Sequence, residues 1–552
     1  MAMKAVKRFK WYHFCRIAAN QGLHIVIYMA EAISDEIGDG IDLDTKAVLL
    51  LREALQEVAL ARSERAFDDI DYTLISDSGD TSEEDNSNAY EEQIIAQYDY
   101  FVVERANMLQ ILLWCRQCST SDVSYMIHGK DGMSVTFAMT CNLCSTEWFW
   151  STSPRCAPKD SKKINKDFAT ATACTGLAFS KFAAVCDTLR IPCLTVQSYQ
   201  YIIRNKVYPA VHRVHTDTQE NVIQSIANQG NLAGLDLSGD AMFDSRGFSA
   251  YYCRYALLDV SSGMVVEAEW MRKKRGESSK AMEPKTLCSA LKKVNTKLKT
   301  LKTAISVQSV TTDRDPAVAK VLETSFPQIV TYYDCWHFLR NIEKALWKKM
   351  DQKQMASMRP WIKPLIDHLY YSIKNANGDG VTARERILSF FYHCQGVHRN
   401  FKKLNGHSFT KIHRCSHGPL AQNLPYLNLN DKKHKKAWNI VYDIITEPKR
   451  FRDLLKVSPH FTTSETESFN AISTLYHDKS KFYSENGFRM RVQLSVLHWN
   501  GLKDDERNGV RTSIAIKKHY SKTLKKSVTR TQKSSGTHKW RQDILEIVRN
   551  SI

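Results

Sequence analysis

The chain has 552 residues, a length that predicts three or four domains or one core with large insertions. Its 77 Lys and Arg residues against 59 Asp and Glu give a net charge of +18, which is compatible with a polyanionic partner such as nucleic acid and equally with a merely solvated basic surface. No apolar run approaches the roughly 20 residues of a membrane-spanning helix and the first residues lack a signal-peptide pattern, so we expect an intracellular protein without membrane contact.

The first hundred residues contain two segments of different composition. Residues 1–67 show the apolar periodicity of amphipathic helices. Residues 68–99 are acidic, and the part from 68 to 92 holds ten Asp and Glu but no Lys or Arg. This composition predicts a disordered linker.

Two Cys-x-x-Cys pairs mark residues 100–157. Cys115 and Cys118 lie in CRQC, Cys141 and Cys144 lie in CNLC, and 22 residues separate the pairs. Cysteines of an intracellular protein are expected to be reduced, and two thiolate pairs on tight turns can supply four tetrahedral zinc ligands. Because the intervening run has the pattern of a hairpin, the interval predicts a zinc ribbon, with four incidental free cysteines as the alternative.

Residues 165–212 predict a small helical domain with a break at Ile191-Pro192, and this domain is a candidate DNA-binding unit. Cys174 and Cys186 lie in apolar runs of this domain, and Cys253 lies in an apolar run further along the chain. We expect all three to be small core residues.

Residues 230–345 alternate strand-like and helix-like runs in the order three strands, helix, strand, helix, strand, helix. This order is the pattern of a ribonuclease-H-like (RNase H-like) α/β core, in which the ends of the first and fourth strands lie side by side. The first predicted strand ends near Asp240, whereas Asp313 ends the fourth and Asp334 the fifth.

Two carboxylates at neighbouring strand ends repel each other unless a divalent cation lies between them. Two-metal phosphoryl transfer uses such an arrangement. Asp244 is the rival of Asp240 for the first acid, and Asp315 is a weaker rival of Asp313.

A third acid is expected from a later helix. The candidate is Glu467 at the start of a predicted helix near residues 465–476. Ser464 and Glu467 also fit a capping box, S-x-x-E, and both roles are compatible because a first-turn glutamate is held rigidly.

The sequence resembles the family of eukaryotic cut-and-paste DNA transposases of the DDE, RNase H-like kind. The resemblance rests on four blocks in order: SGDAMFDSRGFSAYY, VTTDRDPAVAKVL, YYDCWHFLRNIEKAL with its Asp/Cys-x-x-His motif, and SETESFNAISTLY. It covers about residues 100–500 and is closest to Kolobok-like or insertion-sequence-like enzymes.

The resemblance implies roles for the acids. Asp240, Asp313 and Glu467 would be the catalytic residues that bind Mg²⁺ or Mn²⁺. His337 would lie beside them, and Asp334 and Asp244 would be auxiliary residues. A helix-capping or core position is the alternative for His337.

The implied activity is metal-dependent cleavage and transfer of DNA strands at transposon ends, in the nucleus. The partners would be the double-stranded DNA of the terminal repeats and of the target, with a homo-oligomer as an option. The basic tetrad RKKR at 272–275 fits nuclear import. A transposase-derived DNA-binding protein without catalysis is the alternative, and a nucleic-acid module whose acids only cap and pair is a third reading.

The resemblance interprets residues 346–460 as a helical insertion that separates the first part of the core from a second part at 461–500. Within the insertion, His407, His413, Cys415 and His417 are close enough in sequence to suggest a metal site, although their spacing fits no standard one. Residues 501–552 form a basic tail with thirteen Lys and Arg against five Asp and Glu. Its part from 511 to 541 is expected to be flexible and to bind DNA without sequence preference.

Overall fold

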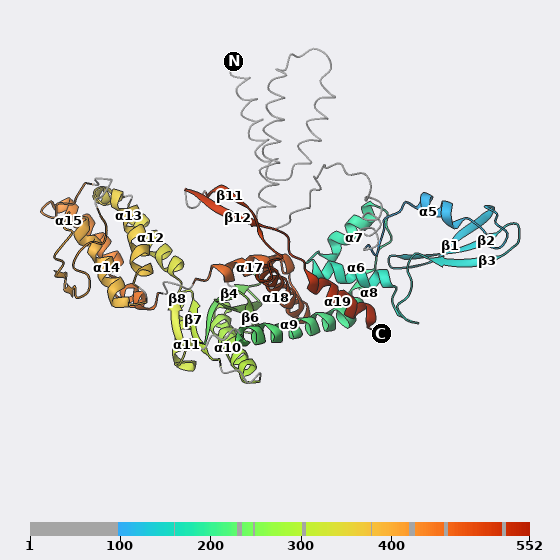
Figure 1. The fold of residues 1–552 in the computed structure, drawn as a ribbon, viewed down its shortest axis with the longest axis horizontal. Helices are drawn as coiled ribbons and strands as arrows, with labels where there is room; N and C mark the ends of the chain where they lie inside the picture. The colour runs from blue at the N-terminus through green and yellow to red at the C-terminus, as the bar shows by residue number, and fades with distance from the viewer. Residues whose placement is uncertain are drawn as a thin grey trace, which may run out of the picture. The chain divides into compact units, whose positions relative to one another are not determined.

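The computed structural model describes residues 98–551 apart from short gaps at residues 159, 229–233, 247–248, 301–304, 351, 377, 419–424, 458–461 and 522–525. The predicted helical region 1–67 and nearly all of the acidic linker 68–99 lie outside the described residues. Figure 1 traces the described elements in chain order.

The segment with the two cysteine pairs folds into an antiparallel sheet of three strands after a short helix. Its elements are α5 (Arg105–Leu112), β1 (Val123–Asp131), β2 (Ser134–Cys141) and β3 (Glu147–Ser151). The central strand buries Phe137 and Met139, two residues apart, because successive side chains of a strand point to opposite faces. Cys115 and Cys141 belong to the same small core.

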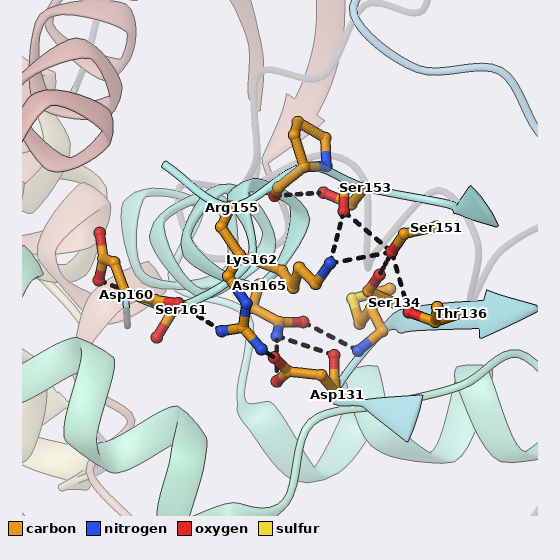
Figure 2. A network of polar contacts seen from close by, with 12 residues as sticks. Asp131, Ser134, Thr136, Ser151, Ser153, Arg155, Asp160, Ser161, Lys162 and Asn165 are labelled. Carbon is orange, nitrogen blue, oxygen red and sulfur yellow. Dashed lines mark hydrogen bonds and ion pairs between the residues drawn. The ribbon is translucent and has the colours of Figure 1, made fainter. Parts of the chain in front are cut away.

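A polar network joins this sheet to the helix that follows it (Figure 2). The buried Lys162 donates from Nζ to Ser151 Oγ at 2.9 Å and to the carbonyl of Ser153 at 3.0 Å. Asn165 accepts from the backbone N–H of Met133 at 2.8 Å and donates to the carbonyl of Asp131 at 3.0 Å. The two bonds of Asn165 satisfy backbone groups at the β1–β2 turn, which would otherwise be costly to bury.

Four helices from the middle of the chain pack with one from its end. They are α6 (Lys163–Cys174), α7 (Phe179–Thr188), α8 (Val196–Ile202), α9 (Tyr208–Asn228) and α19 (Lys539–Asn550), with a π-helical turn η1 (Ile203–Val207) between α8 and α9. Cys174 and Cys186 are buried in their common core, as expected from the sequence.

The middle of the chain forms a mixed α/β layer around a sheet of five strands in the order β6-β5-β4-β7-β8. The strands are β4 (Leu235–Phe243), β5 (Tyr252–Asp259), β6 (Val265–Arg272), β7 (Val307–Thr312) and β8 (Val330–Tyr333), with α10 (Met282–Thr300) and α11 (Pro316–Ser325) between them. Strands β6, β5 and β4 pair antiparallel, whereas β4, β7 and β8 pair parallel. The first and fourth strands of this segment are therefore neighbours.

Both faces of the sheet are covered by helices. All eight residues of β5 are buried, which explains why its sequence lacks apolar–polar alternation. Tyr255 and Leu257 belong to the core that includes residues of α10. Ala256 and Leu258 point the other way, into a core shared with Phe469 of α17 (Ser464–Tyr476) and with α18 (Glu485–Arg507).

The segment between β8 and α17 is mainly helical and has its own apolar core. Its elements are α12 (Cys335–Met350), α13 (Ile362–Lys374), α14 (Gly380–His393), β9 (Lys403–Leu404), β10 (His407–Ser408), α15 (Lys432–Ile445) and α16 (Pro448–Asp453). The helices expected for an insertion are thus present.

The end of the chain differs from the expected flexible tail. Residues 513–521 and 526–533 form the antiparallel pair β11 (Ser513–Ser521) and β12 (Lys526–Lys533), and α19 follows. Trp540, Ile544 and Val548 are buried at helical spacing, and Arg549 pairs with the buried Asp167 at 2.7 Å. The sequence analysis missed this apolar stripe because basic residues dominate the composition of the segment.

Three of the predicted domain boundaries fall inside helices: 212 in α9, 345 in α12 and 500 in α18. Helix α9 shows the reason, since Val214 packs in the helical core whereas Val222 and Ile223 pack in the core of the sheet. A helix shared by two cores carries no turn signal at the boundary between them.

Candidate active site and metal-binding clusters

The pairing of β4 with β7 brings Asp240 and Asp313 together. In this parallel pair Ser238 lies opposite Thr311. Asp240 follows two residues after Ser238, and Asp313 follows two residues after Thr311. Side chains two residues apart share a face of the sheet. That face carries α17, because Ser238 Oγ lies 3.0 Å from the Oγ1 of Thr466 in that helix.

Helix α17 supplies Glu467 to the same place. Its carboxylate Oε1 lies 2.7 Å from Nε2 of His337. The capping box considered from the sequence is not formed, because Thr463 occupies the N-cap position without a side-chain cap and Ser464 is the first helical residue. The carboxylate of Glu467 is therefore directed to His337 and not to the backbone of its own helix.

His337 lies between two of the acids. Its Nε2 is 3.6 Å from Asp313 Oδ1 in addition to its contact with Glu467. Burial lowers the pKa of His337, but the charge of Asp313 and the hydrogen bond to Glu467 outweigh burial and raise this pKa above its ordinary value. The imidazolium form, which bears a proton at Nε2, is thereby favoured.

Asp334 positions these groups without facing the site. It is 2% exposed, and one carboxylate oxygen accepts from the backbone N–H of His337 at 2.8 Å. The other oxygen accepts from the backbone N–H of Thr463, also at 2.8 Å. One carboxylate thus caps α12 and fixes the start of α17, the two helices that carry His337 and Glu467.

Asp240 is held by residues that the sequence analysis did not select. Asn470 donates from Nδ2 to Asp240 Oδ2 at 2.7 Å and accepts a hydrogen bond from Arg254. Arg254 is fully buried, donates to Ser473 Oγ at 2.6 Å and lies over the ring of Phe469. Two signals were present: an arginine inside an apolar strand, and an asparagine three residues after Glu467 on the same helix face.

Burial disfavours the ionised form of two carboxylates of this site, Asp240 and Asp313. Burial, followed by the charge of Asp313, raises the pKa of Asp240 to about 6. Burial is also the main cause that raises the pKa of Asp313, with Asp334 and Glu467 adding to it against His337. Asp313 Oδ1 is buried and has no hydrogen-bond partner among the described residues. Three carboxylates with an unsatisfied oxygen fit a divalent cation such as Mg²⁺ or Mn²⁺.

A fourth acid near the site was not expected. Glu283 stands in the first turn of α10. Burial, then the charges of Asp315, Asp240 and Asp313, raise its pKa to about 7. No motif marks this residue in the sequence, and only the packing of α10 on the sheet brings it near the other acids.

The two rival acids have structural partners. Asp244 accepts from the backbone N–H groups of Tyr251 and Tyr252 at 3.0 and 3.1 Å. Asp315 is the N-cap of α11 and accepts from the N–H groups of Ala317 and Val318. Both carboxylates therefore stabilise local backbone, whereas Asp240 and Asp313 do not cap a helix.

The four cysteines of the ribbon form a compact cluster. Their sulfur atoms all lie within 4.8 Å of one another, with 3.6 Å between Cys115 and Cys144 and 3.5 Å between Cys118 and Cys141. Zn–S bonds of about 2.3 Å in a tetrahedron place sulfurs about 3.8 Å apart, so the cluster can bind a metal ion such as zinc.

The two cysteine turns have the same backbone form. Ser119 and Ser145, each directly after the second cysteine of its pair, have φ of 55° and 57°. In each turn the backbone N–H of the first cysteine donates to the backbone carbonyl of the threonine that follows the serine, at 2.8 and 2.9 Å. The repeated sequence Cys-x-x-Cys-Ser-Thr thus builds the two halves of one site.

A second cluster of possible metal ligands lies in the helical segment between β8 and α17. Its members are His393, His398, Cys415 and His417. The set expected from the sequence contained Cys415 and His417 but named His407 and His413 as their partners. The structure corrects this: His413 Nδ1 contacts the carbonyl of Phe401 at 3.3 Å, and His407 packs on the ring of Phe451.

A family model for Mutator-like transposases matches residues 99–418. This interval is more than half of the chain and contains the ribbon, Asp240, Asp313 and His337. The chain belongs to the Mutator-like transposase family. No curated protein matches it.

The family assignment confirms the predicted transposase and, with it, DNA as the partner. The match names neither Kolobok-like nor insertion-sequence-like enzymes, so that finer assignment stays a prediction. The matched region ends before Glu467, whose place in the site rests on the structure. In this Mutator-like transposase, none of the helices in the described part of the chain combines the length and apolarity that a membrane span requires.

Proposed function

We propose that the chain is a DDE-type transposase with an RNase H-like core, which cleaves and transfers DNA strands at transposon ends. The observation that carries the proposal is the convergence of Asp240, Asp313 and Glu467 from two adjacent parallel strands and one helix, around a buried Asp313 oxygen without a hydrogen-bond partner among the described residues. The strand order supports this core, because the first and fourth strands are neighbours.

Asp240, Asp313 and Glu467 would hold Mg²⁺ or Mn²⁺. Two such ions stabilise the attacking and leaving oxygens of phosphoryl transfer. Asn470 orients the carboxylate of Asp240, and the buried Arg254 fixes Asn470 in turn. The raised pKa of His337 favours a proton at Nε2 beside Glu467, and a protonated Nε2 can donate to a phosphate oxygen of the DNA.

Two basic surfaces suit a DNA backbone. The strand β11 exposes Lys517 and Lys518 on opposite faces of the β11–β12 hairpin. A two-stranded antiparallel hairpin fits the major groove of DNA. A cavity of about 400 Å³ beside the end of α17 is lined by Lys181, Arg246 and Lys481, among others. These cations can neutralise phosphates without reading sequence.

Three further features belong to the proposal. The four cysteines of the ribbon would hold one structural Zn²⁺, because protein ligands fill all four positions and leave none for a substrate. The enzyme would act in the nucleus, for which the exposed part of the RKKR run after β6 is a candidate import signal. The element's terminal repeats and a target duplex would be its DNA partners, and a homo-oligomer stays a prediction.

The proposal is tested by Asp313→Asn, which removes a ligand charge and nearly preserves shape. We expect Mg²⁺-dependent cleavage of a DNA carrying the ends of the element to be lost, by about 10³-fold or more, while binding of the same DNA is retained. Strand cleavage on gels and fluorescence anisotropy measure the two properties. Asp315→Asn, two residues away, is the matched control and should leave cleavage near the wild-type rate.

Two outcomes would contradict the proposal. Cleavage by Asp313→Asn at the wild-type rate would remove the acid from the mechanism. A wild-type chain that binds the DNA but cleaves it with neither Mg²⁺ nor Mn²⁺ would instead support the alternative, a transposase-derived DNA-binding protein without catalysis.

A further inference from the structure

We propose that the helical segment between β8 and α17 contains a second zinc site, formed by His393, His398, Cys415 and His417. One ligand atom of each residue lies within 4.8 Å of those of the other three. The site is separate from the carboxylates and from the cysteine ribbon, and it offers three nitrogens and one sulfur.

The distances within the cluster match a tetrahedral ion. His393 Nδ1 lies 3.1 Å from His417 Nε2 and 3.6 Å from Cys415 Sγ. Zinc with Zn–N bonds of about 2.05 Å and a Zn–S bond of about 2.3 Å separates two nitrogens by about 3.4 Å and nitrogen from sulfur by about 3.6 Å. The three imidazole rings are nearly perpendicular to one another, with interplanar angles of 89°, 90° and 86°, so they approach one centre from different directions.

The fold assembles the ligands from two segments. His393 is the last residue of α14, and His398 follows within the next turn of chain. An antiparallel bridge pairs Arg399 with Arg414, and the N–H of Cys415 donates to the carbonyl of His398 at 2.9 Å. This bridge carries Cys415 and His417 back to the end of α14. The resulting spacing, His-x4-His, sixteen residues, Cys-x-His, is irregular, which explains why the sequence alone pointed to the wrong partners.

The hydrogen bonds around the cluster leave nitrogens free to bind a metal. His417 donates from Nδ1 to the carbonyl of Gly418 at 2.7 Å, which places the lone pair on Nε2, the atom that faces His393. His398 Nε2 contacts the hydroxyl of Tyr426 at 3.3 Å, whereas its Nδ1 is buried and has no hydrogen-bond partner among the described residues. Outer hydrogen bonds that fix the imidazole tautomer are typical of histidines that bind metal.

A hydrogen-bonded cluster without metal explains less. A single N–H···N bond between His393 and His417 accounts for their 3.1 Å contact, but it leaves the buried nitrogen of His398 unsatisfied. Three imidazoles and a thiolate are the donors that zinc prefers over Mg²⁺ or Ca²⁺. Four protein ligands complete the coordination, so the ion would be structural and would hold the loop that joins α14 to α15.

The first test is the zinc content of the purified full chain, measured by mass spectrometry. We expect two zinc ions per chain. His417→Ala and Cys415→Ser should each reduce this to one, as should Cys118→Ser in the ribbon. His407→Gln and His413→Gln are the matched controls from the same segment, and both should retain two.

The second test identifies the donor atoms. Cobalt is loaded into the Cys118→Ser chain, in which the ribbon has lost a ligand. The expected spectrum has tetrahedral bands with the weak charge-transfer absorption of a single thiolate, and the added change Cys415→Ser removes that absorption. A wild-type chain that carries a single zinc, which is lost in Cys118→Ser and retained in Cys415→Ser, overturns the proposal, and so does a Cys118→Ser chain that binds neither metal.

Discussion

The cysteine ribbon and the carboxylate site differ in what holds their ligands together. In the ribbon, four thiols come from one stretch of 30 residues and lie 3.5–3.6 Å apart in two pairs, around a core of few apolar side chains. In the carboxylate site, Asp240 and Glu467 lie far apart in sequence, and a large sheet core with helices on both faces brings them together.

The two regions would use a metal differently. A small unit with a minimal core would depend on zinc for its folded state, since binding energy there is folding energy. The carboxylates are placed by the sheet and would need a cation to offset their repulsion, not to assemble. Loss of metal should therefore unfold the first region and leave the second folded but inactive.

The largest expected effect comes from breaking the ribbon. Cys118→Ser, or treatment with a strong chelator, should abolish amide protection in β1–β3 and make the segment sensitive to protease, because a bound zinc would contribute several kcal/mol to its folding. Hydrogen exchange measured by mass spectrometry checks this, with the protection of β5 as the internal reference. Undiminished protection of β2 after complete zinc removal would contradict the comparison.

Asn470→Ala should reduce the rate of DNA cleavage by about 10–100-fold and raise the Mn²⁺ concentration that gives half of the maximal rate. Asn470 positions Asp240 without being proposed as a ligand, so the shift in metal dependence is the informative quantity. Ser468→Ala, at an exposed position of the same helix, is the matched control. Equal metal dependence in Asn470→Ala and wild type would leave Asn470 with a structural role only.

Glu283→Gln tests the repulsion itself. The pKa of Glu283 is raised to about 7 in the folded chain, above its ordinary value, so its ionised form costs stability at pH values above the folded pKa and costs none below the unfolded one. In the metal-free chain the variant should gain about 2 kcal/mol at about pH 8 and nothing near pH 4. Thermal unfolding at both pH values measures it, and a gain of equal size at both would point to packing instead of charge.

The smallest effect is expected from the DNA surface. Lys517→Ala combined with Lys518→Ala should weaken binding to all DNA sequences alike and reduce the slope of log affinity against log salt by about 2. The double change of Lys292 and Lys299 to alanine, at exposed positions of α10, is the control. An unchanged slope of log affinity against log salt after the substitutions in β11 would show that the hairpin does not contact DNA.

The sequence predicted features in proportion to how local they are. The spacing of the Cys-x-x-Cys pairs predicts that the four cysteines lie together. The apolar runs that end near Asp240 and at Asp313 locate the central strands. Glu467 was selected because a third acid is expected from a later helix, and the resemblance then implied its role. Arg254 and Asn470 were missed, because their contact arises only after α17 packs on the sheet.

Two further differences have the same origin. The partners of Cys415 and His417 depend on a bridge between Arg399 and Arg414 that no spacing rule encodes. Helix α19 was hidden because basic residues surround its buried Trp540, Ile544 and Val548. Long-range packing, not local pattern, decided both cases.

The proposed carboxylate site is tested most directly by locating Mn²⁺ by anomalous diffraction in crystals of the full chain bound to DNA ends. We expect Mn²⁺ between Asp240, Asp313 and Glu467, with ions about 4 Å apart if two are bound, and no density at this place in Asp313→Asn. Carboxylates that stay more than about 10 Å apart, or a site without Mn²⁺ at saturating concentration, would contradict it.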